Sequence, residues 1–129
     1  MKNIHIISTD KPSRLYFNHN KGFEKYQFSK EPFINGLTNT TNQNIYITSD
    51  EEIKEWYIYE GKLLRASVNH SKYEMLYGKA VILTTDQDLI KDGIQAIDEE
   101  FLEWFVKNPS CEEVEVKDVY KTFLEGDKR

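Results

Sequence analysis

"NIYITSDEEIKEWYIYEGKLLRASVNHSKYEMLYGKAVILTT", residues 44–85, is the longest region of the chain with the composition of β-strands. Ile45 and Ile47 alternate with Tyr46, as expected for a half-buried strand. Further runs rich in β-branched and aromatic residues follow at 56–59, 62–68, 73–77 and 79–85, with turn signals at Glu60-Gly61, Asn69-His70 and Gly78. This pattern predicts an antiparallel meander of three or four strands. Ser49 and Glu52 have the spacing of a capping box, which predicts a single helical turn over residues 50–55.

"DEEFLEWFVKNP", residues 98–109, has the pattern of an amphipathic helix. Asp98 is a suitable N-cap, and the apolar residues Phe101, Leu102, Phe105 and Val106 recur at the helical period. Asn108-Pro109 ends the helix, because the residue before a proline avoids the α region. The predicted fold class is therefore α+β: mainly an antiparallel β meander, as a small sheet or an open barrel, packed by one C-terminal helix.

The remaining segments predict a single domain over residues 1–129. Residues 3–8 and 13–18 have the pattern of short strands, and residues 22–29 give a weaker signal of the same kind. Residues 35–44 contain almost nothing to bury, so we expect a flexible loop there. Residues 117–129 are expected to form a tail or a frayed helix.

Composition excludes some classes of protein. No apolar run approaches the roughly 20 residues that cross a bilayer, and the first residues lack the apolar block of a secretory signal. The single cysteine permits no internal disulfide, which fits a reducing compartment. We therefore expect a cytoplasmic protein with no membrane contact.

Charge is distributed unevenly along the chain. Residues 86–118 hold eleven acidic residues against three lysines, a net charge of −8, whereas residues 1–44 have a net charge of +3. A rigid acidic face attracts basic surfaces, although most charge runs are solvated surface and folding could bring the two regions together. The candidate partner-binding residues are Asp98, Glu99, Glu100, Glu103, Trp104, Glu112 and Glu113.

The first half of the chain interleaves basic and aromatic residues, a combination that holds single-stranded nucleic acid by phosphate contact and stacking. The candidates for such contacts are Lys11, Arg14, Lys21, Lys25 and Lys30. The alternative is that these aromatic residues belong to the core. The same two interpretations, a protein-binding surface or packing under the C-terminal helix, apply to Tyr46, Trp56, Tyr57 and Tyr59.

No catalytic constellation is evident in the sequence. His5, His19, His70 and Cys111 lack partners at zinc-site spacing, and Glu112 and Glu113 disfavour the thiolate of Cys111. The carboxylates occupy cap and helix-surface positions, where they are alike and hydrated, rather than differing in environment within one cleft. We therefore expect no catalytic residues, no metal, no cofactor and no enzymatic activity.

Residues 81–116, above all "TTDQDLIKDGIQAIDEEFLEWFVKNPSCEEVEV", resemble a family of small uncharacterised proteins encoded by bacterial phages and prophages. "NIYITSDEEIKE" and the first 17 residues are similar as well, but "EEIKEW" lacks the Gly-Asp pair that family members commonly carry after "EEIKE". Family members also tend to continue past "EVEV" with further strands.

The resemblance implies a non-enzymatic accessory protein of a mobile element. We expect it to inhibit a host defence system, most specifically as an anti-CRISPR protein that binds an RNA-guided Cas nuclease, and to contact RNA only indirectly. The alternatives are a nucleic-acid-binding accessory protein, which would contact RNA directly, and a protein-interaction module without an inhibitory role.

Overall fold

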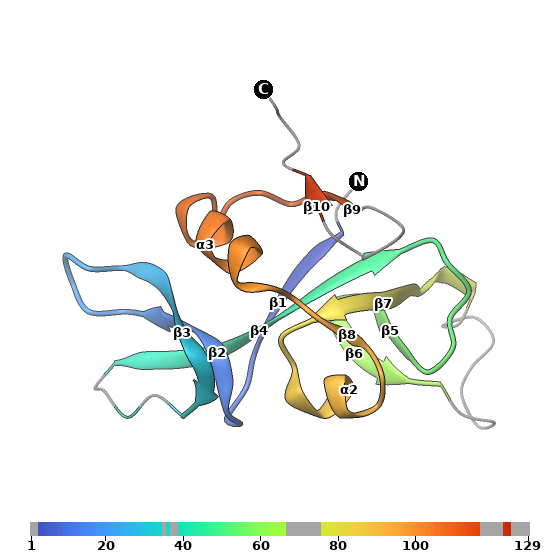
Figure 1. Cartoon of the computed structure of the whole chain (residues 1–129), viewed down its shortest axis with the longest axis horizontal. Coiled ribbons are helices and arrows are strands. Elements are labelled where there is room, and N and C mark those ends of the chain that lie inside the picture. The colour runs from blue at the N-terminus through green and yellow to red at the C-terminus, as the bar shows by residue number, and fades with distance from the viewer. Residues whose placement is uncertain (1–2, 35, 37–38, 67–75, 117–122, 125–129) are drawn as a thin grey trace.

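The computed structural model of the chain describes residues 3–34, 36, 39–66, 76–116 and 123–124. The elements are β1 Ile4–Ser8, β2 Ser13–Asn18, β3 Lys25–Phe33, β4 Thr40–Ser49, β5 Trp56–Tyr59, β6 Lys62–Arg65, β7 Lys79–Thr84, α2 Gln87–Lys91, β8 Gln95–Ala96, α3 Glu99–Lys107, β9 Glu115–Val116 and β10 Phe123–Leu124. Within these residues, β1 to β8 form one mainly antiparallel open sheet, with α2 and α3 packed against it (Figure 1). The predicted α+β class is confirmed.

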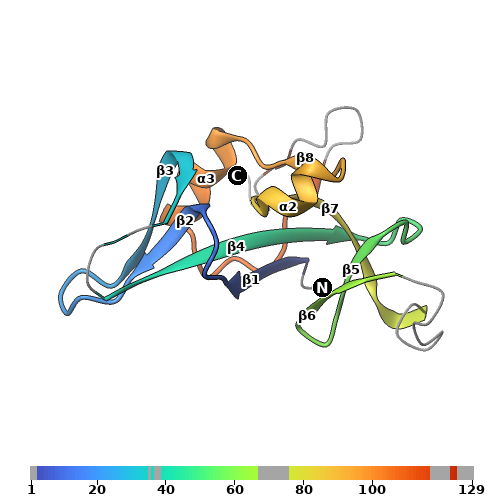
Figure 2. The ribbon, with the colours of Figure 1, turned by 90° about the horizontal axis from the view of Figure 1, so that it is seen from below.

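Strand β4 is the central strand of the sheet, and it runs across the whole molecule (Figure 2). Strand β1 pairs with residues 43–47 along one edge of β4. Along the other edge, β2 pairs with residues 40–43 and β7 pairs with residues 46–49. Two groups of strands therefore share β4: β2 and β3 at its N-terminal end, and β7, β5 and β6 at its C-terminal end. Because β7 lies between β4 and the β5–β6 hairpin, the strands do not follow simple sequential order.

Buried hydrogen bonds join the two groups at the centre of β4, where β2 ends its pairing and β7 begins. Asn44 Oδ1 accepts from Thr85 Oγ1 at 3.0 Å and lies 3.0 Å from Ser13 Oγ, so one side chain contacts both groups. Thr85 Oγ1 in turn accepts from the backbone N–H of Ile45 at 2.9 Å. Buried polar groups are tolerated only when they are hydrogen-bonded, and these side chains satisfy one another.

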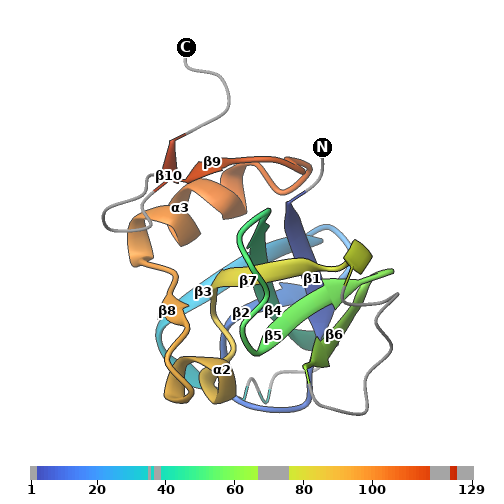
Figure 3. The ribbon, with the colours of Figure 1, turned by 90° about the vertical axis from the view of Figure 1, so that its right-hand side faces the viewer.

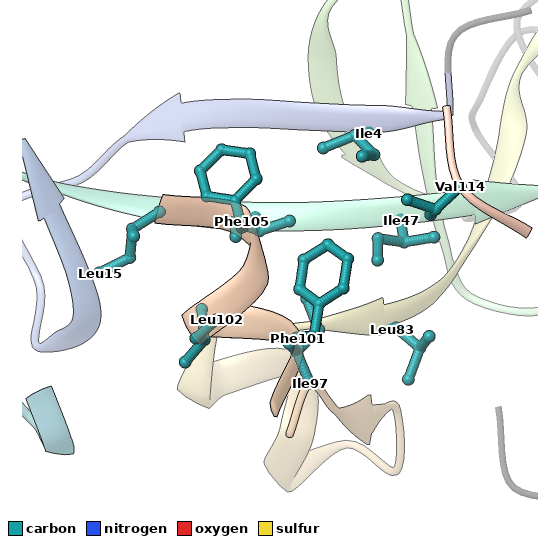
Figure 4. Packing of buried hydrophobic residues seen from close by; sticks show 10 residues of the cluster. Ile4, Leu15, Ile47, Leu83, Ile97, Phe101, Leu102, Phe105 and Val114 are labelled. Atoms are coloured by element: carbon teal, nitrogen blue, oxygen red, sulfur yellow. The ribbon is translucent and has the colours of Figure 1, made fainter. Parts of the chain in front are cut away.

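The main core lies between α3 and the sheet. Figure 4 shows the rings of Phe101 and Phe105 extending from α3 toward β1 and β4, with Leu15 on one side and Leu83 on the other. The cluster consists of Ile4, Leu15, Ile45, Ile47, Leu83, Ile97, Phe101, Leu102, Phe105 and Val114. Asp98 Oδ1 accepts from the N–H of Phe101 at 2.9 Å, which confirms the predicted N-cap. The predicted apolar stripe is therefore the buried face of the helix.

A second, smaller cluster lies beneath α2 and contains Tyr46, Ile58, Val81 and Leu89. Asp86 caps this helix at its N-terminus, and Gly93 follows its end with a φ of 106°, which only glycine adopts readily. Tyr46 and Tyr57 are buried, whereas Trp56 and Tyr59 are half-buried. These aromatic residues therefore pack mainly into the sheet, and Tyr46 lies under α2 rather than under the C-terminal helix.

The flexible loop predicted at 35–44 is wrong for residues 40–44, which form the first half of β4. Asn42, Gln43 and Asn44 are buried there in spite of their polar side chains. Asn42 shows the reason, because its Nδ2 donates to the carbonyl oxygens of Phe33 at 2.9 Å and Lys11 at 3.1 Å. Burial of this segment depends on hydrogen bonds to distant residues, which hydropathy does not register.

Three further local predictions differ from the structure or fall partly outside it. Residues 50–55 form bends and irregular backbone instead of a helical turn, and Ser49 Oγ accepts from the N–H of Glu51. Of the strand predicted at 73–77, residues 73–75 lie outside the described part, and residues 76–77 are helical. Most of the tail or frayed helix predicted at 117–129 also lies outside it, and residues 123–124 form β10, which pairs with β9.

The junction on β4 is tested by the substitution Thr85→Val, which keeps the shape of the side chain and removes its hydroxyl. The buried N–H of Ile45 then loses its acceptor, and we expect the free energy of unfolding to fall by about 1–3 kcal/mol. Urea unfolding measures this change. The matched control is Thr41→Val, whose hydroxyl bonds only to the exposed His19 ring in the contacts described, and its effect should stay within about 0.5 kcal/mol. Equal losses of unfolding free energy in the two variants would contradict a special role for the junction.

Candidate functional site: an acidic surface on α3

Helix α3 presents acidic side chains on the side opposite to its buried face. Phe101, Leu102 and Phe105 are fully buried, which fixes the rotation of the helix. Glu100 and Glu103 are exposed and stand three positions apart, so they are neighbours on the outer surface. Asp98 and Glu99 are also exposed, at the N-terminal end. We call Asp98, Glu99, Glu100 and Glu103 the acidic surface.

One member of the acidic surface is partly neutralised. Glu99 Oε1 lies 3.4 Å from Arg14 Nη2, and the Arg14 side chain is only 15% exposed. Arg14 also donates from Nε to the carbonyl oxygen of Ser29 at 3.0 Å, so it connects β2, β3 and α3. Within the part of the chain that the structure describes, Glu100 and Glu103 form no ion pair. The unneutralised charge of the acidic surface therefore lies mainly on these two residues.

Glu112 and Glu113 lie on a separate segment that is held beside the start of β1. The carbonyl oxygen of Glu112 accepts from the N–H groups of Asn3 at 2.8 Å and Ile4 at 3.2 Å. The Asn3 side chain donates to the carbonyl oxygen of Val114 and accepts from its N–H, each at 2.9 Å. The Asn3 side-chain amide thus makes the pair of hydrogen bonds with Val114 that the backbone of a neighbouring strand would make. We call the hydrogen bonds of Asn3 and Ile4 to residues 112–114 the clamp. Both glutamates are exposed, and the clamp fixes the position of their backbone.

Trp104, the aromatic member of the predicted partner-binding set, is half-buried. Its ring packs against the main core, with its centroid 5.6 Å from that of Phe101. The indole therefore contributes to the hydrophobic core, and only part of it remains at the surface.

The acidic residues within and beside α2, Asp86, Asp88 and Asp92, do not extend the acidic surface. Tyr46 donates its hydroxyl to Asp86 at 2.5 Å, Lys11 pairs with Asp88 at 2.8 Å, and Trp56 Nε1 donates to Asp92 at 3.2 Å. The hydrogen bond to Lys11 holds the pKa of Asp88 below its usual range, and burial raises the pKa of Tyr46. The −8 segment is therefore divided, and the carboxylates near α2 have structural partners.

The predicted nucleic-acid contacts are divided in a similar way. Lys11 and Arg14 are engaged by Asp88 and Glu99, whereas Lys21, Lys25 and Lys30 are exposed on the β2–β3 hairpin and its turn. Among the aromatic residues, Tyr26 packs against Phe17 and Phe105, with ring centroids 4.8 and 5.2 Å away. Phe23 is different, because it is 65% exposed in the turn of the hairpin.

None of the described helices is long and apolar enough to cross a membrane. No group of three or more His, Cys, Asp and Glu side chains among the described residues has an arrangement that could hold a metal ion. Comparison with family models, curated proteins and solved structures finds no match to this chain. The resemblance to phage-encoded proteins therefore stays a prediction.

A groove beside Trp56 was not predicted from the sequence. It is lined by residues 51–52 and 54–56, by residues 80–82 of β7 and by residues 93–95, with a volume of about 250 Å³. These segments are far apart in the sequence, and no motif connects them. The one available signal was the tryptophan surrounded by Glu51, Glu52 and Glu55.

The clamp that positions Glu112 and Glu113 is tested by Asn3→Ala. The substitution removes both side-chain bonds to Val114, so we expect hydrogen exchange of the Val114 amide to accelerate by about two- to tenfold. Exchange measured by NMR reports this change, and the amide of Phe105 in α3 is the internal reference. Asn18→Ala, which alters only contacts within the β2–β3 hairpin, is the matched control. Unchanged exchange at Val114 would show that the segment is held by other contacts.

Proposed function

We propose that the protein acts by binding rather than by catalysis, as an inhibitor of a host defence system in the cytoplasm. The specific partner we propose is an RNA-guided nuclease, which makes the protein an anti-CRISPR. The observation that carries the binding mode is the pair Glu100 and Glu103, exposed on a rigid capped helix and unpaired among the described residues. The choice of a nuclease rests on the resemblance to phage-encoded proteins.

The physical argument is electrostatic. Nucleases of this class bind guide RNA in basic channels, and a channel that recognises phosphates also attracts carboxylates. Because the buried face of α3 is anchored in the core, its glutamates are presented without a large cost in ordering the backbone. Rim charges of this kind accelerate association more than they increase affinity, so binding should weaken as salt screens them.

A second candidate function is nucleic-acid binding through the β2–β3 hairpin. Lys21, Phe23 and Lys25 are exposed together around its turn, which offers a stacking ring between two positive charges. This alternative predicts that the purified protein carries nucleic acid that high salt removes. A preparation with no excess absorbance at 260 nm would count against it.

The inhibitor proposal is tested in bacteria that carry nuclease-based immunity. Expression of the protein should restore transformation by a targeted plasmid. An affinity pull-down from the same cells, with and without ribonuclease, should recover the nuclease itself, and recovery only without ribonuclease would indicate an RNA bridge. If immunity is untouched and the nuclease is not captured, the protein is an interaction module without this inhibitory role.

The acidic surface is tested by the double substitution Glu100→Lys/Glu103→Lys. We expect partner affinity at low salt to fall by about 5- to 30-fold, because attraction becomes repulsion at two exposed positions. Glu99 is left intact because it pairs with Arg14. The control is Glu31→Lys/Glu60→Lys, which changes net charge equally at two exposed positions outside the acidic surface. Surface plasmon resonance measures the affinity and circular dichroism the helix. Equal losses of affinity in the two variants would show that the effect comes from net charge and not from the position of the glutamates.

A further inference from the structure

Part of β7 has no neighbouring strand on the edge that faces away from β4. On that edge β5 pairs with Lys79 and Ala80, and β8 pairs with Leu83 and Thr84. Val81 and Ile82 lie between these pairings and pair with neither strand. The pairing with β4 is irregular at the same place, because its register skips Ile82. The bulge and the gap together leave a groove in the sheet beside Trp56, which we call the Trp56 groove.

The Trp56 groove is lined by both apolar and acidic residues, and we call its acidic residues the rim. Val81, Ile82, Ile94 and Trp56 supply apolar lining. The rim carries Glu51, Glu52 and Glu55 against one lysine, Lys54. Its volume of about 250 Å³ is many times the roughly 10–15 Å³ that one water molecule requires, so a long side chain can enter.

Arg65 of the same chain already contacts Trp56, and its contacts indicate that this part of the protein binds a guanidinium group. Its guanidinium carbon lies 5.2 Å from the centroid of the Trp56 ring, in the geometry of a cation–π contact. Arg65 Nε donates to Glu55 Oε2 at 2.7 Å, and Arg65 Nη2 lies 4.0 Å from Asp92 Oδ2. Asp92 also accepts from Trp56 Nε1 at 3.2 Å, which holds the indole in place. An aromatic face and two carboxylates therefore already hold one planar cation beside the groove.

We propose that the Trp56 groove binds an arginine side chain of a partner protein. The aliphatic part of that side chain would cover Val81 and Ile82, and its guanidinium would meet Trp56 and the glutamates of the rim. Arginine fits better than lysine because its planar, weakly hydrated head stacks on an aromatic ring and forms paired bonds with carboxylates. The groove is independent of the acidic surface, because Trp56 belongs to β5, which lies on a different side of the molecule from α3 (Figures 1 and 3).

The first experiment titrates N-acetyl-arginine amide into ¹⁵N-labelled protein and follows the spectrum by NMR. The indole N–H of Trp56, identified by comparison with Trp104→Phe, and the amides of Val81 and Ile82 should shift with the same saturable dependence. The citrulline analogue, which keeps the shape and removes the charge, should shift them much less. Equal affinity for both compounds, shifts centred on α3, or no saturable shift would each overturn the proposal.

Two substitutions with opposite expected signs sharpen the test. Glu52→Gln removes one rim carboxylate and should weaken binding of the arginine amide by about two- to fivefold. Arg65→Gln removes the internal competitor from Trp56 and Glu55 and should strengthen binding by about two- to fivefold, a gain that misfolding does not produce. Weaker binding by Arg65→Gln in a protein with an unchanged melting temperature would overturn the proposed site.

Glu103→Gln is the control variant, because it lies on the acidic surface and outside the groove. It should leave binding of the arginine amide unchanged, even if it weakens binding of the nuclease. The two proposals therefore fail separately. Equal binding of the arginine amide and its citrulline analogue would contradict the groove proposal. Nuclease binding that is unchanged by substitutions of the α3 glutamates would contradict the acidic-surface proposal.

Discussion

The architecture depends on a single strand that is shared by two groups of neighbours. Strand β4 pairs with β2 over its first residues and with β7 over its last, and the change of partner occurs at Asn44 and Ile45. A change of partner exposes backbone groups that must be satisfied inside the protein, where an unpaired donor is costly. Thr85 Oγ1 accepts from the N–H of Ile45, Thr84 Oγ1 donates to the carbonyl oxygen of Ile45, and Asn44 Oδ1 in turn accepts from Thr85 Oγ1. Polar side chains at the junction therefore satisfy the groups that are exposed where the two strand groups meet on β4.

The same junction places the surfaces that face solvent. Because β7 is held on β4, the chain leaving β7 passes through α2 and β8 and brings α3 back over β1 and β4. The capped helix then buries its aromatic residues and turns its glutamates outward. At the opposite edge of β7, the incomplete pairing leaves the Trp56 groove. One strand thus positions both the acidic surface and the groove.

Folding also redistributes the charge that the sequence separates. Lys11 and Arg14 come from the basic first third of the chain and pair with Asp88 and Glu99 from the acidic region. These exposed or partly exposed pairs add little stability, but they remove charge from the surfaces that could contact a partner. What remains is a local excess of negative charge on α3 and of positive charge on the β2–β3 hairpin. The net charge of a segment therefore overstates the charge of a surface.

The sequence by itself determined the features that depend on near neighbours: the α+β class, strands β1, β2, β5 and β7, and helix α3 with its Asp98 cap and buried aromatic stripe. These follow from periodicity and capping over a few residues. Only the tertiary structure decided that residues 40–44 are a buried strand, that Arg14 is committed to Glu99, and that a groove opens beside Trp56. Each of these depends on atoms tens of residues apart along the chain. The local sequence pattern therefore does not predict them, because hydrogen bonds and ion pairs between distant segments exist only after the sheet has assembled.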